Sequence, residues 1–504
     1  MEGFISALNG IIWSPALIYL CLGAGLFYSI LTRFAQVRHF KEMCKLLLNN
    51  SESEKGISSF QALAVSLSGR VGVGNIAGVA AAIGFGGPGA IFWMWVVAFL
   101  GASTAYVEST LGQLYKVEEN GQYRGGPAYY FERCLGWRWL GILFAVSAII
   151  GCGIFLPGVQ ANAVGNAVTQ IFGEGAMVVT TFGEVGTYKL IALAVILIVL
   201  AFIIFGGIKR IAHFTQIVVP FMALGYIVMA LIVVFLNMDK VPGIFSLILS
   251  DAFTAQAGFG AAIGWGVKRG IYSNEAGQGT GPHAAAAAEV EHPSQQGLVQ
   301  AFSVYVDTLF VCTATALMIL ITQQYNVVGE LTDGSFIVQN VDAATEIGSA
   351  AFTQMALLSV FGNFGQVFVG LALFFFAFTT ILAYYYITET NVAYLNRVFN
   401  NKLPTIVFKL LLMFMVAYGT VNSAGYIWNI GDIGVGLMAW VNVLGILAIF
   451  FMYKPTMRCL RDFEQQKKAG GPITFDPVKL GITNATFWEK RLAKAQAEQD
   501  KHLP

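Results

Sequence analysis

Long apolar runs separated by short polar stretches recur along the whole chain. Each run holds about 20 residues or more, which is enough for a helix to cross the hydrocarbon core of a bilayer. We therefore expect an all-α integral membrane protein. The pattern predicts eleven transmembrane helices, at 12–32, 60–84, 88–115, 138–171, 187–208, 211–236, 254–282, 296–323, 354–385, 402–424 and 428–453.

Charged residues test this arrangement, because one added or missing span would move every later loop to the other side of the membrane. The intervening connections hold little more than Lys189 and Lys240, and 324–350 is acidic. Cytoplasmic loops carry an excess of Lys and Arg. The sequence therefore places the N-terminus outside and the C-terminus in the cytoplasm. Basic residues gather in every second connection and in the tail: Arg33, Arg38, Lys41, Lys45, Lys55, Lys116, Arg124, Arg133, Arg138, Lys209, Arg210, Arg397, Lys402, Lys454, Arg458, Arg461, Lys467 and Lys468.

Composition agrees with a membrane protein. Of 504 residues, 56% are hydrophobic and only 11% are charged, whereas soluble domains carry about 25% charged residues. A net charge of +1 gives no indication of a nucleic-acid partner. The six cysteines form no CxxC pair, so neither a metal site nor a disulfide framework is indicated. The N-terminus lacks the basic region of a signal peptide.

Two of the apolar runs are interrupted by glycine. Residues 66–80 contain four glycines together with Arg70 and Asn75, and residues 258–270 are also glycine-rich. Broken backbone at membrane depth is tolerated only where protein or a wet cavity surrounds it, and paired broken helices indicate a transport site. A glycine-rich kink that serves packing alone is the plainer alternative. The Gly277–Gly281 segment is expected to be a flexible cytoplasmic elbow.

The two interrupted runs lie five spans apart. Since five is odd, the two halves must have opposite orientations in the membrane, which is the signature of an inverted repeat. The predicted organisation is an N-terminal peripheral helix with a basic loop (1–59), a first five-helix repeat (60–236), a second (237–453) and a cytoplasmic tail (454–504). A loose tail is the plainer interpretation of the last segment, although 487–496 has a helical pattern.

A few polar residues inside spans are candidates for chemistry. The hydroxyls of Thr379 and Thr380 suit an alkali cation, but a threonine in a membrane helix commonly bonds to its own i−4 carbonyl, and local sequence favours that reading. Gln160 follows a helix-bending proline and either binds substrate or joins helices. Asp307 lies mid-span, where acids are usually paired or functional, with Arg70, Lys268 and Arg269 as candidate partners.

Several segments together resemble the signature of the sodium:alanine symporter family, over about residues 60–385. They are Ser68-Gly-Arg-Val-Gly-Val-Gly-Asn-Ile-Ala-Gly-Val-Ala80, Gly86-Gly-Pro-Gly-Ala-Ile-Phe-Trp-Met-Trp95, Arg124-Gly-Gly-Pro-Ala-Tyr-Tyr130, Arg269-Gly-Ile-Tyr-Ser-Asn-Glu-Ala-Gly277 and His292-Pro-Ser-Gln-Gln-Gly297. The resemblance implies a LeuT-type fold of two inverted five-helix repeats with broken first helices. It also implies sodium-coupled uptake of small amino acids.

The resemblance also implies a sodium site. In LeuT-type sites, two carbonyls of the first broken helix and a carbonyl and two adjacent hydroxyls of the eighth core helix hold the cation. Val71-Gly-Val-Gly-Asn75 is similar to the corresponding run of the neurotransmitter:sodium symporters, and 354–385 is the eighth core helix once the first span is set aside. The implied ligands are the carbonyls of Ser68, Val71 and Phe376 and the hydroxyls of Thr379 and Thr380.

The substrate is expected between the two breaks. Its carboxylate would meet backbone N–H groups around Gly72–Asn75, at a helix N-terminus, and its ammonium would meet carbonyls near Gly264–Gly266. The predicted substrate-binding residues are Gly72, Gly74, Asn75, Gln160, Gly264, Trp265 and Gly266. Many family members carry a small residue in place of Arg70, whose guanidinium could replace a second sodium ion or contact substrate. We expect Arg70 to pair with Asp307; bonding to carbonyls freed by the break is the alternative.

The sequence therefore predicts a secondary active transporter, not an enzyme, in the bacterial plasma membrane. It would carry a small neutral amino acid, alanine or glycine first, together with Na⁺ by alternating access. The open alternatives are a proton-coupled or glutamine-preferring carrier of the same fold and, in another class, a channel. No HExxH or GxSxG motif indicates catalysis.

Overall fold

The structure is a computed structural model that describes residues 2–47, 56–119, 121–181, 183–205, 207–254, 259–329, 335–397 and 403–500. Within these residues, nine helices are long and apolar enough to cross a membrane. They are Glu2–Leu31, Ala90–Leu114, Arg138–Phe172, Thr187–Ile204, Ile208–Leu236, Pro293–Ile321, Asn363–Asn396, Leu403–Val421 and Ala424–Met452. The chain is therefore a multi-pass helical membrane protein, as predicted.

Most of these helices match single predicted runs. They are α7 (Ala90–Leu114), α11 (Thr187–Ile204), α12 (Gly207–Leu236), α20 (Leu403–Val421) and α21 (Ala424–Met452). Three others are composite. The first joins α1 (Glu2–Ile12) and α2 (Pro15–Leu31). The second joins α9 (Arg138–Ala148), η2 (Ile149–Phe155) and α10 (Leu156–Phe172). The third joins α16 (Pro293–Val304), η3 (Tyr305–Cys312) and α17 (Thr313–Ile321). Both η2 and η3 are π-helical turns, a feature frequent at functional sites.

The predicted runs at 60–84 and 254–282 are broken helices. The first forms α5 (Ser59–Arg70), the 3₁₀ turn η1 (Val73–Asn75) and α6 (Ala77–Gly86), and the second forms α14 (Phe259–Asn274) and α15 (Gly281–Ala287). Residues 255–258, at the start of the second run, lie outside the described residues. Almost every residue of α5, α6 and α15 is buried, so these segments form the centre of the molecule.

One predicted span has different bounds. The run 354–385 contains the end of α18 (Ala351–Phe361) and most of α19 (Asn363–Asn396), because Gly362 adopts a positive φ of 62° and ends α18. From sequence alone, a glycine inside an apolar run does not show whether the helix ends there or continues. Shorter helices that the apolar pattern did not single out are α3 (Ala35–Arg38), α4 (Phe40–Leu46), α8 (Pro127–Leu135) and α13 (Val241–Thr254).

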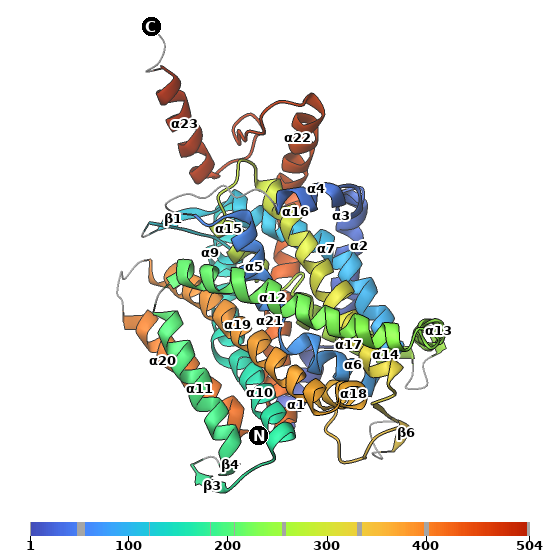
Figure 1. The fold of residues 1–504 in the computed structure, drawn as a ribbon. Coiled ribbons are helices and arrows are strands. Elements are labelled where there is room, and N and C mark those ends of the chain that lie inside the picture. The colour runs from blue at the N-terminus through green and yellow to red at the C-terminus, as the bar shows by residue number, and fades with distance from the viewer. Residues whose placement is uncertain are drawn as a thin grey trace.

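The prediction of an all-α chain missed three short antiparallel hairpins. They are β1 (Val117–Glu119) with β2 (Gln122–Arg124), β3 (Met177–Thr180) with β4 (Gly183–Gly186), and β5 (Asn326–Val328) with β6 (Phe336–Gln339). In register, Glu118 faces Tyr123, Val178 faces Val185 and Val327 faces Val338. All three lie in connections, at the two ends of the helical body (Figure 1).

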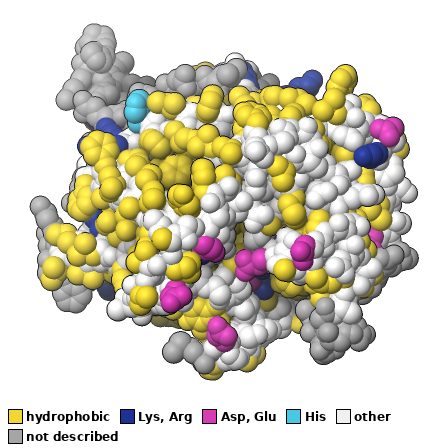
Figure 2. Space-filling model, turned by 60° about the horizontal axis from the view of Figure 1, so that its bottom comes forward, with side chains coloured by type: hydrophobic (Ala, Val, Ile, Leu, Met, Phe, Trp, Pro, Cys, Tyr) yellow, Lys and Arg dark blue, Asp and Glu magenta, His cyan; other side chains and the backbone are white. Residues whose placement is uncertain are grey.

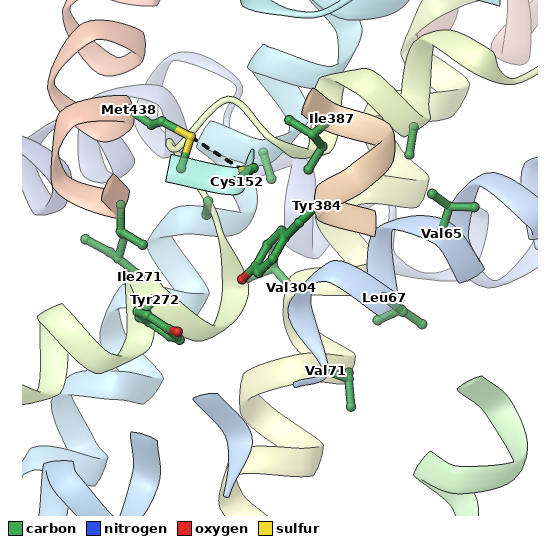
Figure 3. Close-up of a cluster of buried hydrophobic side chains, with 14 of the residues drawn as sticks. Val65, Leu67, Val71, Cys152, Ile271, Tyr272, Val304, Tyr384, Ile387 and Met438 are labelled. Atoms are coloured by element: carbon green, nitrogen blue, oxygen red, sulfur yellow. Dashed lines mark hydrogen bonds between the residues drawn. The ribbon is translucent and has the colours of Figure 1, made fainter. Parts of the chain in front are cut away.

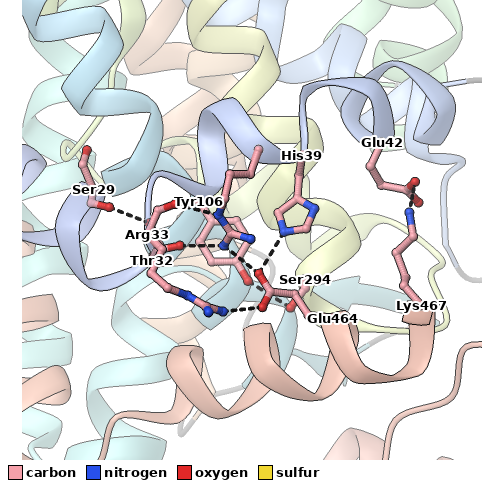
Figure 4. Close-up of polar contacts among 10 residues, drawn as sticks. Ser29, Thr32, Arg33, His39, Glu42, Tyr106, Ser294, Glu464 and Lys467 are labelled. Atoms are coloured by element: carbon pink, nitrogen blue, oxygen red, sulfur yellow. Dashed lines mark hydrogen bonds and ion pairs between the residues drawn. The ribbon is translucent and has the colours of Figure 1, made fainter. Parts of the chain in front are cut away.

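The termini lie at opposite ends of the molecule, and the tail packs on one of them (Figure 1). The tail forms α22 (Pro455–Ala469) and α23 (Thr486–Asp500). Trp488 is only 2% exposed, and its indole donates to the carbonyl of Gln113 at 3.0 Å. Glu464 of α22 pairs with Arg33, Arg38 and His39 at 2.6–3.0 Å (Figure 4). The predicted loose tail is therefore a docked segment.

Candidate functional site

The first helix break is held open by its own residues. A capping box between Ser58 and Gln61 starts α5, and the regular helix ends at Arg70. The amide oxygen of Asn75 then accepts from the backbone N–H of Gly72 at 2.8 Å. Its amide nitrogen donates to Asp307 Oδ1 at 2.6 Å. Asn75 thus fastens the break to η3, and both ends of its side chain are already engaged in protein contacts.

Four of the five predicted sodium ligands come together at this break. The hydroxyl oxygen of Thr380 lies 2.7 Å from the carbonyl oxygen of Ser68 and 2.8 Å from that of Phe376. Thr379 Oγ1 lies 3.1 Å from the same Phe376 carbonyl and 2.9 Å from that of Phe375, so both threonines make the i−4 bond that local sequence favoured. All four residues are fully buried. Such a set of hydroxyl and carbonyl oxygens is chemically suited to a hard alkali cation.

The fifth predicted ligand, Val71, follows α5 directly, so its carbonyl belongs to the broken backbone. Its neighbour Gly72 explains why the segment needs glycine. A Cβ on Gly72 would lie 2.5 Å from Thr380 Oγ1 and 3.0 Å from Gln160 Oε1. Only glycine lets α19 and α10 approach the backbone this closely.

Gln160 reaches the break from α10. Its Oε1 accepts from the backbone N–H of Val73 at 3.1 Å, and the side chain is buried. The predicted residues Gly72, Gly74, Asn75 and Gln160 are therefore neighbours. A Cβ on Gly74 would lie 3.2 Å from Ser273 Cα, so the last turn of α14 packs on the same backbone.

Apolar side chains from several helices close around the break (Figure 3). Val65 and Leu67 come from α5, and Ile387 from α19, whereas Tyr272 of α14 and Tyr384 of α19 bring polar tips into this otherwise apolar shell (Figure 3). The Tyr272 hydroxyl is buried in this shell. A polar atom in a low-dielectric shell is well placed to meet a bound polar ligand.

The second break does not lie where the sequence placed it. Gly264, Trp265 and Gly266 are inside the continuous helix α14, so their carbonyls are not freed by a break. These residues serve packing instead. Trp265 stacks on Phe85 with ring centroids 4.6 Å apart, and a Cβ on Gly266 would lie 2.4 Å from the Ala90 carbonyl oxygen. The predicted interruption at Gly264–Gly266 is wrong.

The actual break is the elbow at 275–280, between α14 and α15. Glu275, Gly277 and Gly279 have positive φ values of 58°, 87° and 79°. The elbow, which the sequence predicted to be a flexible cytoplasmic segment, is fully buried. Positive φ strongly favours glycine, which explains the glycines at 277 and 279. Polar residues stand between them. That alternation, just after the end of α14, was the signal for the break.

Glu108 of α7 holds the elbow in place. Its carboxylate accepts from the backbone N–H groups of Gly277 at 3.3 Å and Gly279 at 3.1 Å, and from the Asn442 amide at 2.7 Å. It is fully buried. Sequence reasoning missed this role, since the partners lie far away along the chain.

The predicted ion pair between Arg70 and Asp307 is not formed. Nη1 of Arg70 donates to the Gln300 carbonyl at 3.0 Å and to the Ser303 hydroxyl, and among the described residues no carboxylate lies within ion-pair distance of it. Asp307 is instead saturated by neutral donors from other elements. It lies in the π-helical turn η3, which aims its carboxylate at Asn75 and at Ser273 of α14.

The other two candidate partners of Asp307 form a separate buried cluster. Arg269 and Lys268 of α14 lie 2.6 Å and 2.7 Å from the same oxygen of Asp432 in α21. The Arg269 guanidinium also covers the ring of Trp428, 4.5 Å from its centroid. The cluster ties α14 to α21.

An open, polar hollow lies at the end of the molecule opposite the tail. Its volume is about 390 Å³, and Glu174, Asp342, Glu346 and Lys189 line it. Acidic side chains gather around a hollow on this face, whose other surroundings are largely apolar (Figure 2). Such an acidic vestibule raises the local concentration of cations.

Buried broken helices, a cluster of buried hydroxyl and carbonyl oxygens and an apolar outer surface are typical of an integral membrane transport protein. The sequence model of the sodium:alanine symporter family matches residues 1–477. The chain belongs to this family of transporters.

Relatives match over nearly their whole length. YrbD of Bacillus subtilis (strain 168), whose name gives sodium/proton-dependent alanine carriage as a provisional assignment, is 54% identical over 97% of this chain and 98% of its own. The sodium/proton-dependent alanine carrier protein of Bacillus sp. (strain PS3) is 46% identical over 92% of this chain and 100% of its own. GlnT of Bacillus subtilis (strain 168), provisionally named a sodium/glutamine symporter, is 39% identical over 97% and 96%.

Proposed function

We propose that this protein is a sodium-coupled symporter of small neutral amino acids, with alanine as its first substrate and glycine as its second. The observation that carries the proposal is the convergence of Ser68, Phe376, Thr379 and Thr380 at the break between α5 and α6. The alanine carriers among its relatives support the substrate. The protein would work by alternating access in the bacterial plasma membrane.

The proposed architecture is LeuT-type. It has eleven transmembrane segments, nine continuous and two broken, with α1–α2 peripheral to two inverted five-helix repeats at 60–236 and 237–453. In the proposed orientation the tail-bearing end faces the cytoplasm, because the basic connections lie there, and the acidic vestibule faces outside. Cations would then enter from the vestibule.

The amino acid would bind where the two breaks meet. Its carboxylate would accept from backbone N–H groups at Gly72–Asn75, where the positive end of the α6 dipole lies. Its ammonium would meet carbonyls of the last turn of α14, around Tyr272 and Ser273, where that helix is negative. Gln160, which already bonds to Val73, would border the pocket.

Glutamine is the alternative candidate substrate. The specific observation in its favour is Gln160 itself, since an amide beside the break can pair with a substrate amide. The relative named for glutamine supports the same alternative. Competition of unlabelled glutamine with labelled alanine uptake separates the two.

Thr380→Ala tests the sodium site. Removing one of about five oxygen ligands of a desolvated cation should raise the sodium concentration for half-maximal alanine uptake at least about tenfold in proteoliposomes. Thr390→Ala is the matched control, because Thr390 lies in the same helix and its hydroxyl donates to the Tyr386 carbonyl, away from the proposed ligands. Equal sodium requirements in the two variants would contradict the proposed site.

A further inference from the structure

Another polar hollow lies at the tail-bearing end of the molecule, between the ends of α2 and α21 and the helix α22. Its volume is about 590 Å³. Charges of one sign dominate the part of its lining that the structure describes. Five positive charges against one negative charge give this lining a net charge of +4. Such a hollow raises the local concentration of counter-ions, so this one attracts anions. The charged lining residues are Arg33, Lys454, Arg458, Arg461, Lys468 and Glu464.

Two of these cations are uncommitted. The Glu464 carboxylate is already paired with Arg33 at 2.6 Å (Figure 4), and Arg458 Nη1 donates to tail carbonyls at 3.2 Å and 2.6 Å. Arg461 and Lys468, in contrast, make neither a hydrogen bond nor an ion pair with any described residue. Both side chains are exposed, so their charged groups are available to an anion that enters the hollow.

The hollow adjoins the surface that faces lipid. Leu31, at the end of α2, lines its apolar side. At the end of α21, Phe451, Met452 and Tyr453 are 67%, 50% and 42% exposed. Lys454 follows at once, and its positive φ of 54° turns the chain from α21 into α22. The cationic lining therefore begins where the apolar surface ends, which is the level of the lipid headgroups.

This combination of charge and apolar surface fits an anionic phospholipid. Its phosphodiester accepts charge-assisted hydrogen bonds from a guanidinium and an ammonium, and its acyl chains cover apolar side chains. A free phosphate or another soluble anion would satisfy the cations but would leave the apolar side uncovered. Basic residues that only fix the orientation of a membrane protein must lie on one side of the membrane, but they do not need to converge on one hollow.

We propose that this hollow binds the headgroup of an anionic phospholipid from the leaflet at the tail-bearing end of the molecule. Arg461 and Lys468 hold the phosphate, and the acyl chains lie along Leu31 and Phe451. The lipid lies between the end of α2 and α22, so it strengthens the attachment of the tail that Glu464 already makes. The proposal goes beyond the proposed symport and depends on neither the substrate nor the coupling ion.

Binding of two lipids to the full-length protein in detergent tests the proposal. Native mass spectrometry, with phosphatidylglycerol and phosphatidylcholine added at equal concentrations, measures the preference for the anionic headgroup. The wild-type protein should bind phosphatidylglycerol at least about tenfold more tightly, and Arg461→Gln combined with Lys468→Gln should lose that preference. Lys41→Gln combined with Lys490→Gln is the matched control and should keep it, because these changes remove two exposed charges outside the hollow.

Arg461→Lys combined with Lys468→Arg preserves both charges and should keep the preference, which separates a loss of charge from a disturbed fold. Equal binding of the two lipids by the wild-type protein would overturn the proposal. So would an undiminished preference in the doubly neutralised variant, or an equal loss in the control, since the lipid would then bind elsewhere. Inorganic phosphate that displaces phosphatidylglycerol at an equal concentration would assign the hollow to a soluble anion and reject the lipid.

Discussion

At the residue scale, the site depends on glycines that leave room for their neighbours as much as on the polar side chains themselves. Gly72 allows α19 to approach the broken backbone, and Gly281 leaves room for Arg70, whose Nη2 would lie 2.8 Å from a Cβ there. The resemblance carried over the proposed sodium ligands, Thr380 among them, one by one, whereas Gly72, Asn75 and Gln160 were predicted from the broken backbone and from polar residues inside spans. It could not predict the partners of Arg70, since hydrogen bonds to Gln300 and Ser303 depend on tertiary packing.

Gly72→Ala should abolish sodium-driven uptake. The new Cβ would lie 2.5 Å from Thr380 Oγ1, so either the hydroxyl or the backbone must leave its position. Gly225→Ala is the control, because a Cβ there meets nothing within 4 Å. Alanine is about 1 kcal/mol better than glycine in a helix interior, so the control should unfold at an equal or higher temperature and transport normally. Normal uptake by Gly72→Ala would show that the close approach to α19 is dispensable.

At the element scale, the sequence predicted most of the long apolar helices and located the first break, because Arg70 and Asn75 stand out in an apolar run. It misplaced the second break. Glycine serves close packing and positive φ equally well, and local sequence does not distinguish them. In α14 the glycines admit α7, whereas those at 277 and 279 make the turn. Nor could periodicity reveal that Asp432 of α21 ties α14 in place.

Asp432→Asn tests that tie. It leaves the buried Arg269 guanidinium and the Lys268 ammonium without their countercharge, and breaking a buried pair in this way costs about 3–5 kcal/mol. The unfolding temperature in detergent should fall and uptake should drop. Combining it with Arg269→Gln should cost less than the sum of the two single changes, because the groups share one interaction. Strictly additive losses would mean that the pair is not coupled.

At the scale of the whole molecule, the tail covers one end of the helical body, which its polar composition did not predict. The burial of its aromatic residues depends on the surface they pack against, and the sequence of the tail does not contain that information. His292 links the two parts. Its Nδ1 accepts from the Ser294 N–H and so caps α16, while Nε2 lies 3.3 Å from Asp462 of α22. The cap requires an unprotonated Nδ1, whereas Nε2–H donates to Asp462 in either form of the ring.

Acid should nevertheless loosen the tail, because a charged ring is disfavoured where Phe463 and Phe475 pack against it. Burial lowers the pKa of His292 below its usual 6.5, despite the bond to Asp462. A lowered pKa means that docking is fully stable above about pH 6.5 and weakens as pH falls below it. Burial alone would raise the pKa of Asp462, but the His292 contact leaves it lowered, so its contribution disappears only below about pH 4.

Hydrogen exchange of α22, corrected for intrinsic rates, should accelerate between about pH 7.5 and about pH 5.5. His292→Gln removes the titrating ring and should abolish that dependence. Exchange that stays constant in the wild-type protein, or that changes equally in His292→Gln, would contradict a role for this histidine.

Sodium coupling is the central claim, and ion flux measures it most directly. Proteoliposomes with equal sodium inside and out, clamped at zero membrane potential, are given an inward alanine gradient, and radiolabelled sodium is followed. The account predicts net sodium entry that stops when alanine equilibrates and is reduced at least about tenfold in Thr380→Ala. Alanine entry with no accompanying sodium movement would contradict it.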